Sequence, residues 1–210
     1  NVPSAIFNEL MAMRTSEYAL KLDANMSKAV SLWLASNFKR EAELPQGAAD
    51  PTRAENQPDA NYYAVASGVQ FVNPVLARAL RDHNAPVAYK AIKALSETAG
   101  ASSLFSGQAG QPMIDALSFP DKVIRFEAAY AIGSSLPQSD FQGKDRAVQI
   151  LADALNATGK PTALALMPNQ NDINALSESL NGQMTIAGST STAGLIAEAQ
   201  KLPSIDYLIV

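Results

Sequence analysis

The sequence contains no cysteine, one histidine and one tryptophan among its 210 residues. The lack of cysteine excludes disulfide bonds, thiolate metal ligands and a cysteine nucleophile. The single histidine, His83, has no Asp, Glu or second His at the spacing of a metal site, and no nucleophile is marked out for it to activate. We therefore expect a surface or capping role for His83, no metal ion or other cofactor, and no enzymatic activity.

Positive charge and long apolar runs are also scarce. The 16 Lys and Arg against 20 Asp and Glu give a net charge of −4, which provides no basic field for a phosphate backbone. No stretch reaches the ~18 consecutive apolar residues of a membrane span. We expect neither a nucleic-acid partner nor a membrane span, and the cellular compartment stays unpredicted. Because the chain begins at Asn1 rather than Met and ends in a predicted strand, we expect it to be part of a longer protein.

One sequence pattern occurs twice, since residues 75–100 align without a gap on residues 112–137 at an offset of 37. The aligned positions share small or apolar side chains: Leu80 with Leu117, Ala91 with Ala128, Ala94 with Ala131, and Leu95 with Ile132. A period of about 20–50 residues is typical of stacked repeats, in which each unit buries its apolar stripe against its neighbour. Each copy is predicted to be a pair of helices, 74–82 with 85–98 in the first and 111–119 with 121–135 in the second.

These residues resemble HEAT repeats, and the second copy is the better match, with Pro-Asp at its turn followed by VIRFEAAYAIG. The resemblance implies an α-α superhelix over residues 60–157. It also implies that Asp121 and Arg125 form a structural pair between adjacent repeats. The first copy has Asn84 and Ala88 at those two positions, so the pair would not form a continuous ladder.

Two further segments complete the N-terminal part. Apolar residues at helical spacing predict helices over 4–22 and 27–44, which we assign to a helical hairpin spanning residues 1–44. The junction ALKLDANMSKAVSLW resembles the junction between tetratricopeptide repeats, with a plain helical hairpin as the alternative. Residues 45–59 contain three prolines and almost no apolar side chains, which predicts a linker. Residues 61–72 are predicted to be helical again.

In the last segment, residues 158–210, the apolar residues follow a different pattern. Strands are predicted over 162–167, 184–188 and 205–210, with helices over 172–180 and 191–202 between them, a pattern typical of a parallel βαβαβ unit. The segment resembles the first half of a response-regulator receiver domain. That family holds Mg²⁺ on two acidic residues at the end of its first strand, where this chain has Met167 and Pro168. The overall prediction is a mainly α fold, an α-α superhelix of HEAT-like helical hairpins followed by a partial flavodoxin-like βαβαβ unit.

The most direct functional interpretation is a non-catalytic scaffold that binds another protein, whose identity the sequence does not give. In stacked helical repeats the second helix usually lines the concave side, which makes Lys90, Lys93, Glu127 and Tyr130 the candidate binding face. The acidic residues outside the repeat turn are expected to be solvated surface: Glu41, Glu43, Asp50, Asp59 and Glu127. One alternative is a signalling module whose receiver-like domain has its phospho-acceptor beyond Val210. Another is an enzyme built on the repeat groove, such as a lyase or a base-excision enzyme. An excision enzyme would need a basic, aromatic-rich channel, against which the charge balance argues.

Overall fold

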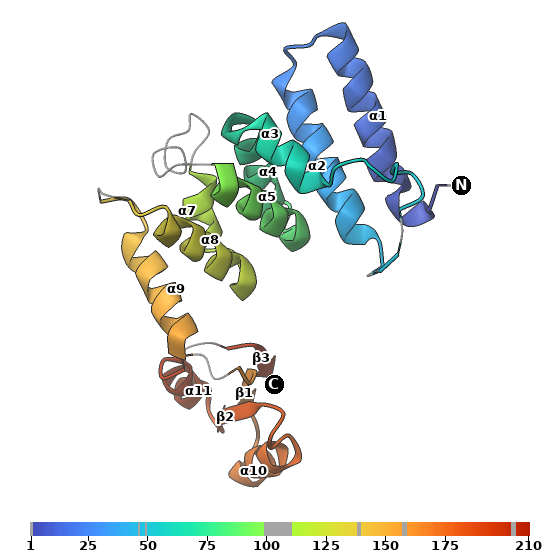
Figure 1. Cartoon of the computed structure of the whole chain (residues 1–210). Coiled ribbons are helices and arrows are strands. Elements are labelled where there is room, and N and C mark those ends of the chain that lie inside the picture. Colours follow the sequence, from blue (N-terminus) through green and yellow to red (C-terminus); the bar gives the residue numbers. More distant parts are fainter. Residues whose placement is uncertain are drawn as a thin grey trace. The chain divides into compact units, whose positions relative to one another are not determined.

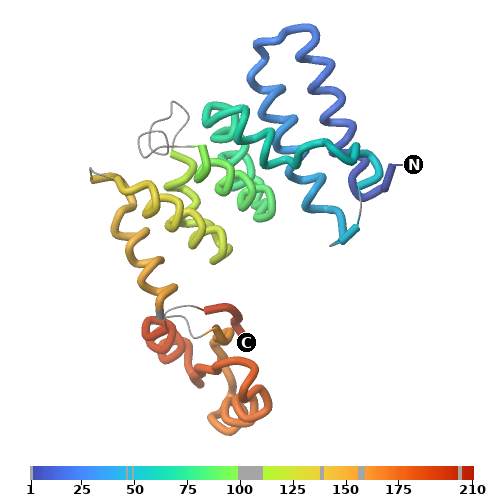
Figure 2. Tube along the Cα trace, viewed as in Figure 1, coloured from blue at the N-terminus to red at the C-terminus, as the bar shows by residue number. Residues whose placement is uncertain are grey.

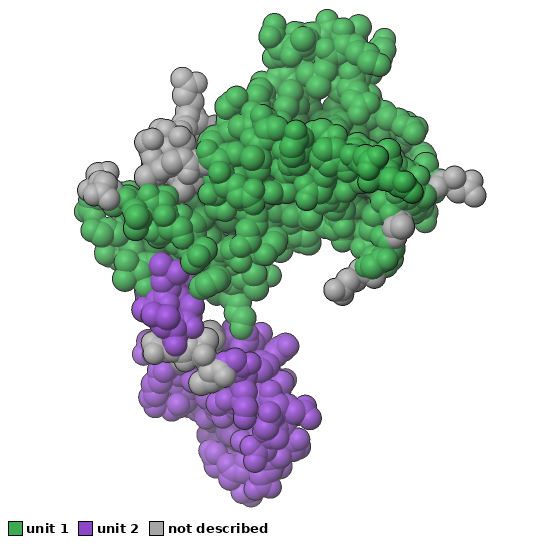
Figure 3. Space-filling view, in the orientation of Figure 1, with its two compact units in different colours: residues 1–148 green, residues 149–210 purple. Residues whose placement is uncertain are grey.

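The computed structural model describes residues 2–45, 47–48, 50–98, 111–137, 140–156, 159–202 and 205–210. The chain divides into two compact units, residues 1–148 and 149–210, which Figure 3 colours separately. The first unit is helical, and the second contains a small parallel sheet (Figure 1). The prediction of a mainly helical chain with a small parallel sheet at its C-terminal end is confirmed.

The chain opens with a helical hairpin. A short 3₁₀ turn, η1 (Ser4–Ile6), leads into α1 (Phe7–Leu22), which lies along α2 (Ser27–Glu43), as the trace in Figure 2 shows. Asp23 leaves the helical conformation, and its side chain accepts a hydrogen bond from the amide of Asn25, which forms the turn. The buried apolar side chains of the hairpin are Ile6, Leu10, Met13, Ala29, Leu34 and Phe38.

The bounds of the helix predicted over 61–72 are wrong. The structure has α3 (Ala60–Ser67) and then α4 (Val69–Arg81), divided by Gly68 at a φ of 89°. Glycine adopts this left-handed conformation without a steric penalty, so the chain ends one helix and begins the next with a single residue between them. Pro74, which we expected to open a helix, instead lies inside α4.

The remaining helices of the first unit continue the stack. They are α5 (Ala85–Thr98), α7 (Pro112–Ala116), α8 (Lys122–Ser134) and the beginning of α9 (Lys144–Asn156). Helix α5 packs on α2, α4 and α8, while α4 packs on α7 (Figure 1). The start of α9 is tied to the end of α7, because Arg146 Nε donates to the carbonyl oxygen of Leu117 at 2.8 Å.

Positions 37 residues apart have closely similar surroundings in the two copies. The pairs in which both side chains are buried are Val75 with Pro112, Leu76 with Met113, Ala79 with Ala116, Val87 with Ile124, Ala91 with Ala128, Ile92 with Ala129, Ala94 with Ala131, and Leu95 with Ile132. Tyr89 and Phe126, also 37 apart, are both 37% exposed. Leu80 is half-buried whereas Leu117 is buried, so that pair matches less well. The two copies therefore place the same positions in the core and on the surface.

The second unit is built on three parallel strands in the order β2-β1-β3, with β1 (Thr162–Leu166), β2 (Thr185–Ser189) and β3 (Tyr207–Ile209). Helices α10 (Gln170–Ser179) and α11 (Thr192–Ala199) connect them and begin at side-chain caps, Asn169 and Ser191. The central strand β1 is the most buried, and its small residues Ala163 and Ala165 are fully covered. Met167 and Pro168 follow β1 directly.

Candidate functional site

The predicted binding face lies on α5 and α8, which pack against each other. Lys93 of α5 forms an ion pair with Glu127 of α8, with 2.7 Å between Nζ and Oε2. The Lys93 ammonium also lies 5.5 Å from the centre of the Tyr89 ring, within cation–π range. The hydrogen bond to Glu127 raises the pKa of Lys93. Lys93 therefore joins the two helices and one of their aromatic residues.

Aromatic side chains occupy the exposed part of this face. The rings of Phe126 and Tyr130 are stacked with their centres 6.1 Å apart, and Tyr130 is 56% exposed. Tyr89 on α5 and Val123 on α8 are also exposed. We call Tyr89, Val123, Phe126 and Tyr130 the aromatic face. Tyr130 belongs to the face predicted from the sequence, and Tyr89 and Phe126 lie on the same two helices.

Lys90, which also belongs to the predicted face, forms an ion pair with a different helix. Its Nζ lies 2.8 Å from Oε2 of Glu41 on α2. The second helices of successive hairpins are thus joined by Lys–Glu pairs, Glu41 with Lys90 and then Lys93 with Glu127.

The expectation that the acidic residues are solvated surface is wrong for three of them. The side chains of Glu41, Asp50 and Glu127 are largely buried, and each accepts from a cation. A carboxylate shielded from water needs compensating donors, and in these three cases Lys or Arg supplies them. These contacts could not be predicted from a repeating pattern in the sequence, because each carboxylate and its Lys or Arg lie between 10 and 49 residues apart.

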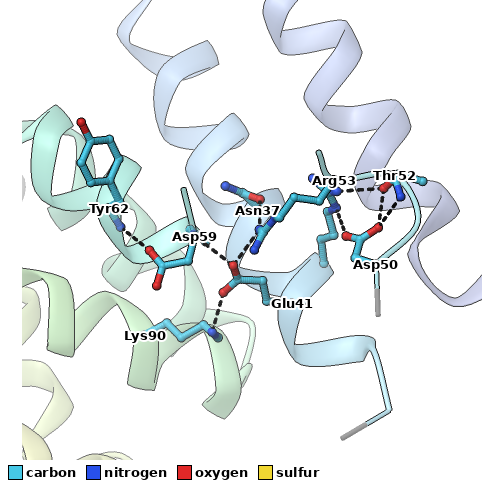
Figure 4. Close-up of polar contacts among 10 residues, drawn as sticks. Asn37, Glu41, Asp50, Thr52, Arg53, Asp59, Tyr62 and Lys90 are labelled. Carbon is cyan, nitrogen blue, oxygen red and sulfur yellow. Dashed lines mark hydrogen bonds and ion pairs between the residues drawn. The ribbon is translucent and has the colours of Figure 1, made fainter. Parts of the chain in front are cut away.

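Glu41 is the centre of a polar cluster, which Figure 4 draws. Its Oε1 lies 2.7 Å from Arg53 Nη2 and accepts the backbone N–H of Ala60 at 2.8 Å, while its Oε2 accepts from Lys90. Burial alone would raise the pKa of Glu41, but the hydrogen bonds from Lys90, Ala60 and Arg53 outweigh it and lower the pKa below 4.5. One carboxylate thus holds α2, the 45–59 segment, the start of α3 and α5 together.

A second buried pair fixes the 45–59 segment to α2. Arg40 Nε donates to Asp50 Oδ2, and Arg40 Nη2 donates to Thr52 Oγ1 at 2.8 Å. Burial acts to raise the pKa of Asp50, and the hydrogen bonds from Thr52 and Arg40 lower it overall. Asp59 at the end of the segment caps α3 through the amide of Tyr62 (Figure 4). The described part of the segment is therefore anchored by polar contacts at both ends.

Asp121 is the N-cap of α8 and Arg125 lies in the first turn of that helix, but they do not form the predicted pair between repeats. Asp121 Oδ1 caps α8 by accepting the amides of Val123 and Ile124 at 2.7 and 3.3 Å. Arg125 Nη1 donates to the carbonyl oxygens of Phe119 and Pro120. Both side chains therefore satisfy backbone groups of their own turn. Asn84, at the position equivalent to Asp121, accepts the amide of Val87 in the same way.

A depression of about 430 Å³ lies among α1, α2, α4 and the start of α5. Leu32 and Val75 are among its apolar lining residues, and Glu9, Lys39 and Arg78 are among its charged ones. Glu9 is buried, with Oε1 accepting from Lys39 at 2.9 Å, and that hydrogen bond raises the pKa of Lys39. Oε2 of Glu9 has no donor among the described residues. The ion pair with Lys39 neutralises Glu9, the buried acid of this depression.

His83 sits in the turn between α4 and α5 at a φ of 52°, with its ring 5.8 Å from the ring of Phe119. Over the described ranges, no cluster of three His, Asp or Glu side chains has the geometry to hold a metal ion. Within the same ranges, no helix combines the length and hydrophobicity needed to cross a bilayer.

Comparisons of the chain with protein-family models, with curated proteins and with solved structures find no match. The HEAT-like, tetratricopeptide-like and receiver-like resemblances therefore stand on the residues that carry them.

Proposed function

We propose that this protein is a non-catalytic scaffold that binds another protein through the aromatic face of α5 and α8. The observation that carries the proposal is the matched exposure of Tyr89 and Phe126, 37 residues apart on neighbouring helices, with Tyr130 stacked on Phe126. Exposed Tyr and Phe side chains are enriched where proteins bind one another, because they bury a large area and lose little conformational entropy.

The ion pair beneath this face supports the proposal. Lys93 links α5 to α8 through Glu127 and lies close to the Tyr89 ring, so these rings are carried by helices that are held together. A surface that is already ordered loses less entropy when a partner binds, which favours affinity. Stacked helical hairpins of the HEAT type would hold such a face in a fixed curvature.

The α-α superhelix and the flavodoxin-like unit belong to the same proposal. The equal burial of positions 37 apart supports a repeated hairpin, and the strand order β2-β1-β3 matches the beginning of the 2-1-3-4-5 order of flavodoxin-like sheets. Met167 and Pro168 offer no ligand for a hard cation at the end of β1, so the second unit is proposed as a folded module without phosphotransfer chemistry.

The experiment that tests the proposal compares three immobilised proteins in affinity capture from an extract of the source cells. They are the wild type, the double variant Phe126→Ser/Tyr130→Ser, and Tyr62→Ser as a control. Tyr62 is 59% exposed, close to the value for Tyr130, but it lies on α3. Far-UV circular dichroism establishes that all three fold equally.

The proposal predicts a protein that is retained by the wild type and by Tyr62→Ser but lost from the double variant. With that partner purified, Tyr130→Ser alone should weaken binding by about five- to thirtyfold, the cost of an interface residue worth about 1–2 kcal/mol. If every captured protein binds the double variant as well as the wild type, the aromatic face is not the binding surface.

A further inference from the structure

The depression among α1, α2, α4 and α5 contains a buried carboxylate that lacks a donor for one of its oxygens. The Glu9 side chain is 6% exposed and lines this depression. Its Oε1 accepts from Lys39, whereas Oε2 has no hydrogen-bond partner among the described residues. A buried carboxylate oxygen without a donor costs free energy, because it has lost the water that would otherwise bind it. Glu9 Oε2 is therefore an acceptor that a donor group of a ligand can satisfy.

The charges around Glu9 favour a cation as that donor. Lys39 Nζ lies 2.9 Å from Glu9 Oε1 and 3.1 Å from Glu43 Oε1, so one ammonium serves two carboxylates. The other charged residues that line the depression, Arg78 and Asp82, pair with each other at 3.2 Å. These five groups carry one more negative than positive charge. A second ammonium beside Glu9 would balance it, and the attraction is strong where little water separates the charges.

The lining of the depression suits a lysine side chain. Small and apolar residues make up the rest of its wall: Ala12, Leu32, Ala35, Val75, Ala79 and Val87. A lysine carries its ammonium on an apolar stem, which such a wall would cover while the charged head reaches the carboxylate. Because Oε1 of Glu9 already accepts from Lys39, only one oxygen is left for the ligand. A single acceptor matches the point charge of an ammonium better than the two-pronged guanidinium of an arginine.

A second depression, of about 290 Å³, continues the first one along α2 and α4. Four lining residues belong to both depressions, Leu32, Ala35, Val75 and Arg78, and we call the two together the α2–α4 groove. The charged residues that line the second depression are all cations: Lys28, Arg78 and Arg81. Lys28 precedes Lys39 by three turns of α2, which is about 16 Å along the helix axis. The groove therefore offers an acceptor for a cation at one end and a cluster of cations toward the other.

We propose that the α2–α4 groove binds a peptide segment of a partner protein that carries a lysine and, about five residues away, an acidic residue. The lysine ammonium donates to Glu9 Oε2, and the acidic side chain pairs with Lys28. An extended peptide rises about 3.3 Å per residue, so about five residues cover the distance between the two ends of the groove. A ligand with positive charge alone, such as a polyamine, would be repelled by Lys28, Arg78 and Arg81. The charge pattern of the groove thus selects a peptide that carries both signs.

The α2–α4 groove is separate from the aromatic face in position and in chemistry, so this inference does not depend on the proposed function. A short peptide in the groove buries much less than the roughly 1,600 Å² of a standard protein interface, and we expect a dissociation constant of about 10–300 μM. A partner that reached both the groove and the aromatic face would bind more tightly than through either surface alone.

The first experiment follows the fluorescence anisotropy of the peptide acetyl-KALAADD, labelled with fluorescein at its acidic end, as the full chain is added up to about 1 mM. Norleucine in place of the lysine keeps the apolar stem without the ammonium and should weaken binding about ten- to hundredfold, the usual worth of a hydrogen bond to a charged group. Asparagine in place of both aspartates should weaken it about two- to fivefold, because that end of the groove is exposed. Spermidine should not displace the peptide. No binding of the lysine peptide, equal binding of the norleucine peptide, or displacement by spermidine overturns the proposal.

The second experiment changes the groove in the protein, and circular dichroism establishes that each variant folds as the wild type does. Glu9→Gln keeps the shape of the side chain and removes its charge, so it should weaken binding of the lysine peptide at least tenfold and leave the norleucine peptide unaffected. Ala35→Leu fills the groove where its two depressions meet and should weaken both peptides. The matched controls are Glu17→Gln, on α1 outside the groove, and Ala66→Leu, at an exposed position of α3, and both should bind as the wild type does. If Glu9→Gln binds the lysine peptide as tightly as the wild type, water alone satisfies Glu9 Oε2 and the proposal is wrong.

Discussion

Arg40 Nε lies 2.6 Å from Asp50 Oδ2, and the two side chains are only 3% and 9% exposed. The two residues belong to α2 and to the proline-containing segment that follows it. A contact of this kind is a buried ion pair, in which each charge depends on the other because water reaches neither.

Replacing Asp50 by alanine should destabilise the protein by about 3–5 kcal/mol, because Arg40 would remain buried without its counter-charge. Urea unfolding followed by the fluorescence of Trp33, which lies on α2, measures the loss. Asp140→Ala is the control, since its pair with Lys144 is at the surface and should contribute less than about 1 kcal/mol. The double variant Arg40→Met/Asp50→Leu should recover most of the loss. Equal stabilities for Asp50→Ala and the wild type would show that the pair does not form in solution.

The stability of the first unit should fall in acid because of Glu41 and Asp50. The pKa values of both carboxyl groups are lowered in the folded protein from ordinary values of 4.5 and 3.8. The unfolded chain therefore binds more protons than the folded chain below about pH 4.5. The contribution of the two groups is complete above that pH and is lost as the pH falls through their folded pKa values.

Urea unfolding between pH 7 and pH 3 checks this dependence. The variant Glu41→Gln should be less stable at pH 7 and should lose less stability on acidification than the wild type. Glu55→Gln, at an exposed position in the 45–59 segment, should leave the curve unchanged. A Glu41→Gln curve parallel to that of the wild type would show that this carboxylate is not linked to folding.

The equivalent caps of α5 and α8 should contribute equally to stability. Asn84→Ala and Asp121→Ala each remove a side-chain acceptor from a helix N-terminus and should each cost about 1 kcal/mol. Asp121→Asn should cost much less, because asparagine caps as well as aspartate. Chemical denaturation of the three variants gives the comparison. If Asp121→Asn is as destabilising as Asp121→Ala, the negative charge of Asp121 has a role beyond capping.

Gly188 of β2 should not tolerate a side chain. A Cβ at this position would lie 2.7 Å from Cγ2 of Ile173 and 3.1 Å from the carbonyl oxygen of Ala165. Gly188→Ala should therefore destabilise the second unit by about 1–3 kcal/mol, the usual cost of overpacking. Hydrogen–deuterium exchange of the β1 and β2 amides reports on this unit separately. In an Ile173→Ala background the cost should shrink, because the side chain in conflict is gone; an additive double variant would contradict the steric explanation.

The helices with caps and periodic apolar residues could be predicted from the sequence. The bounds of α5 agree with the prediction, since Asn84 and Pro86 mark its beginning and its apolar positions repeat at helical spacing. The division of α3 from α4 could not be found in this way. A glycine inside an apolar helical pattern is usually tolerated, and only the packed structure shows that Gly68 takes a left-handed conformation.

The polar interior could not be predicted, because its partners are distant in sequence and follow no period. The stretch between Arg40 and Asp50 contains Pro45 and Gly47, which predict a loop. Nothing in its sequence indicates a buried charge. The binding role of the candidate face stays a prediction. Lys93 and Glu127 form an ion pair between α5 and α8, and Tyr130 lies on α8, while Lys90 pairs with Glu41 because α2 also packs on α5.

Glu41 receives donors from three separate stretches of chain, through Arg53, Ala60 and Lys90. Breaking that cluster would release all three together, so slow amide exchange at the start of α3 and in the neighbouring part of α5 should disappear at the same denaturant concentration. A single carboxylate would then define one cooperative opening unit assembled from sequence-remote pieces.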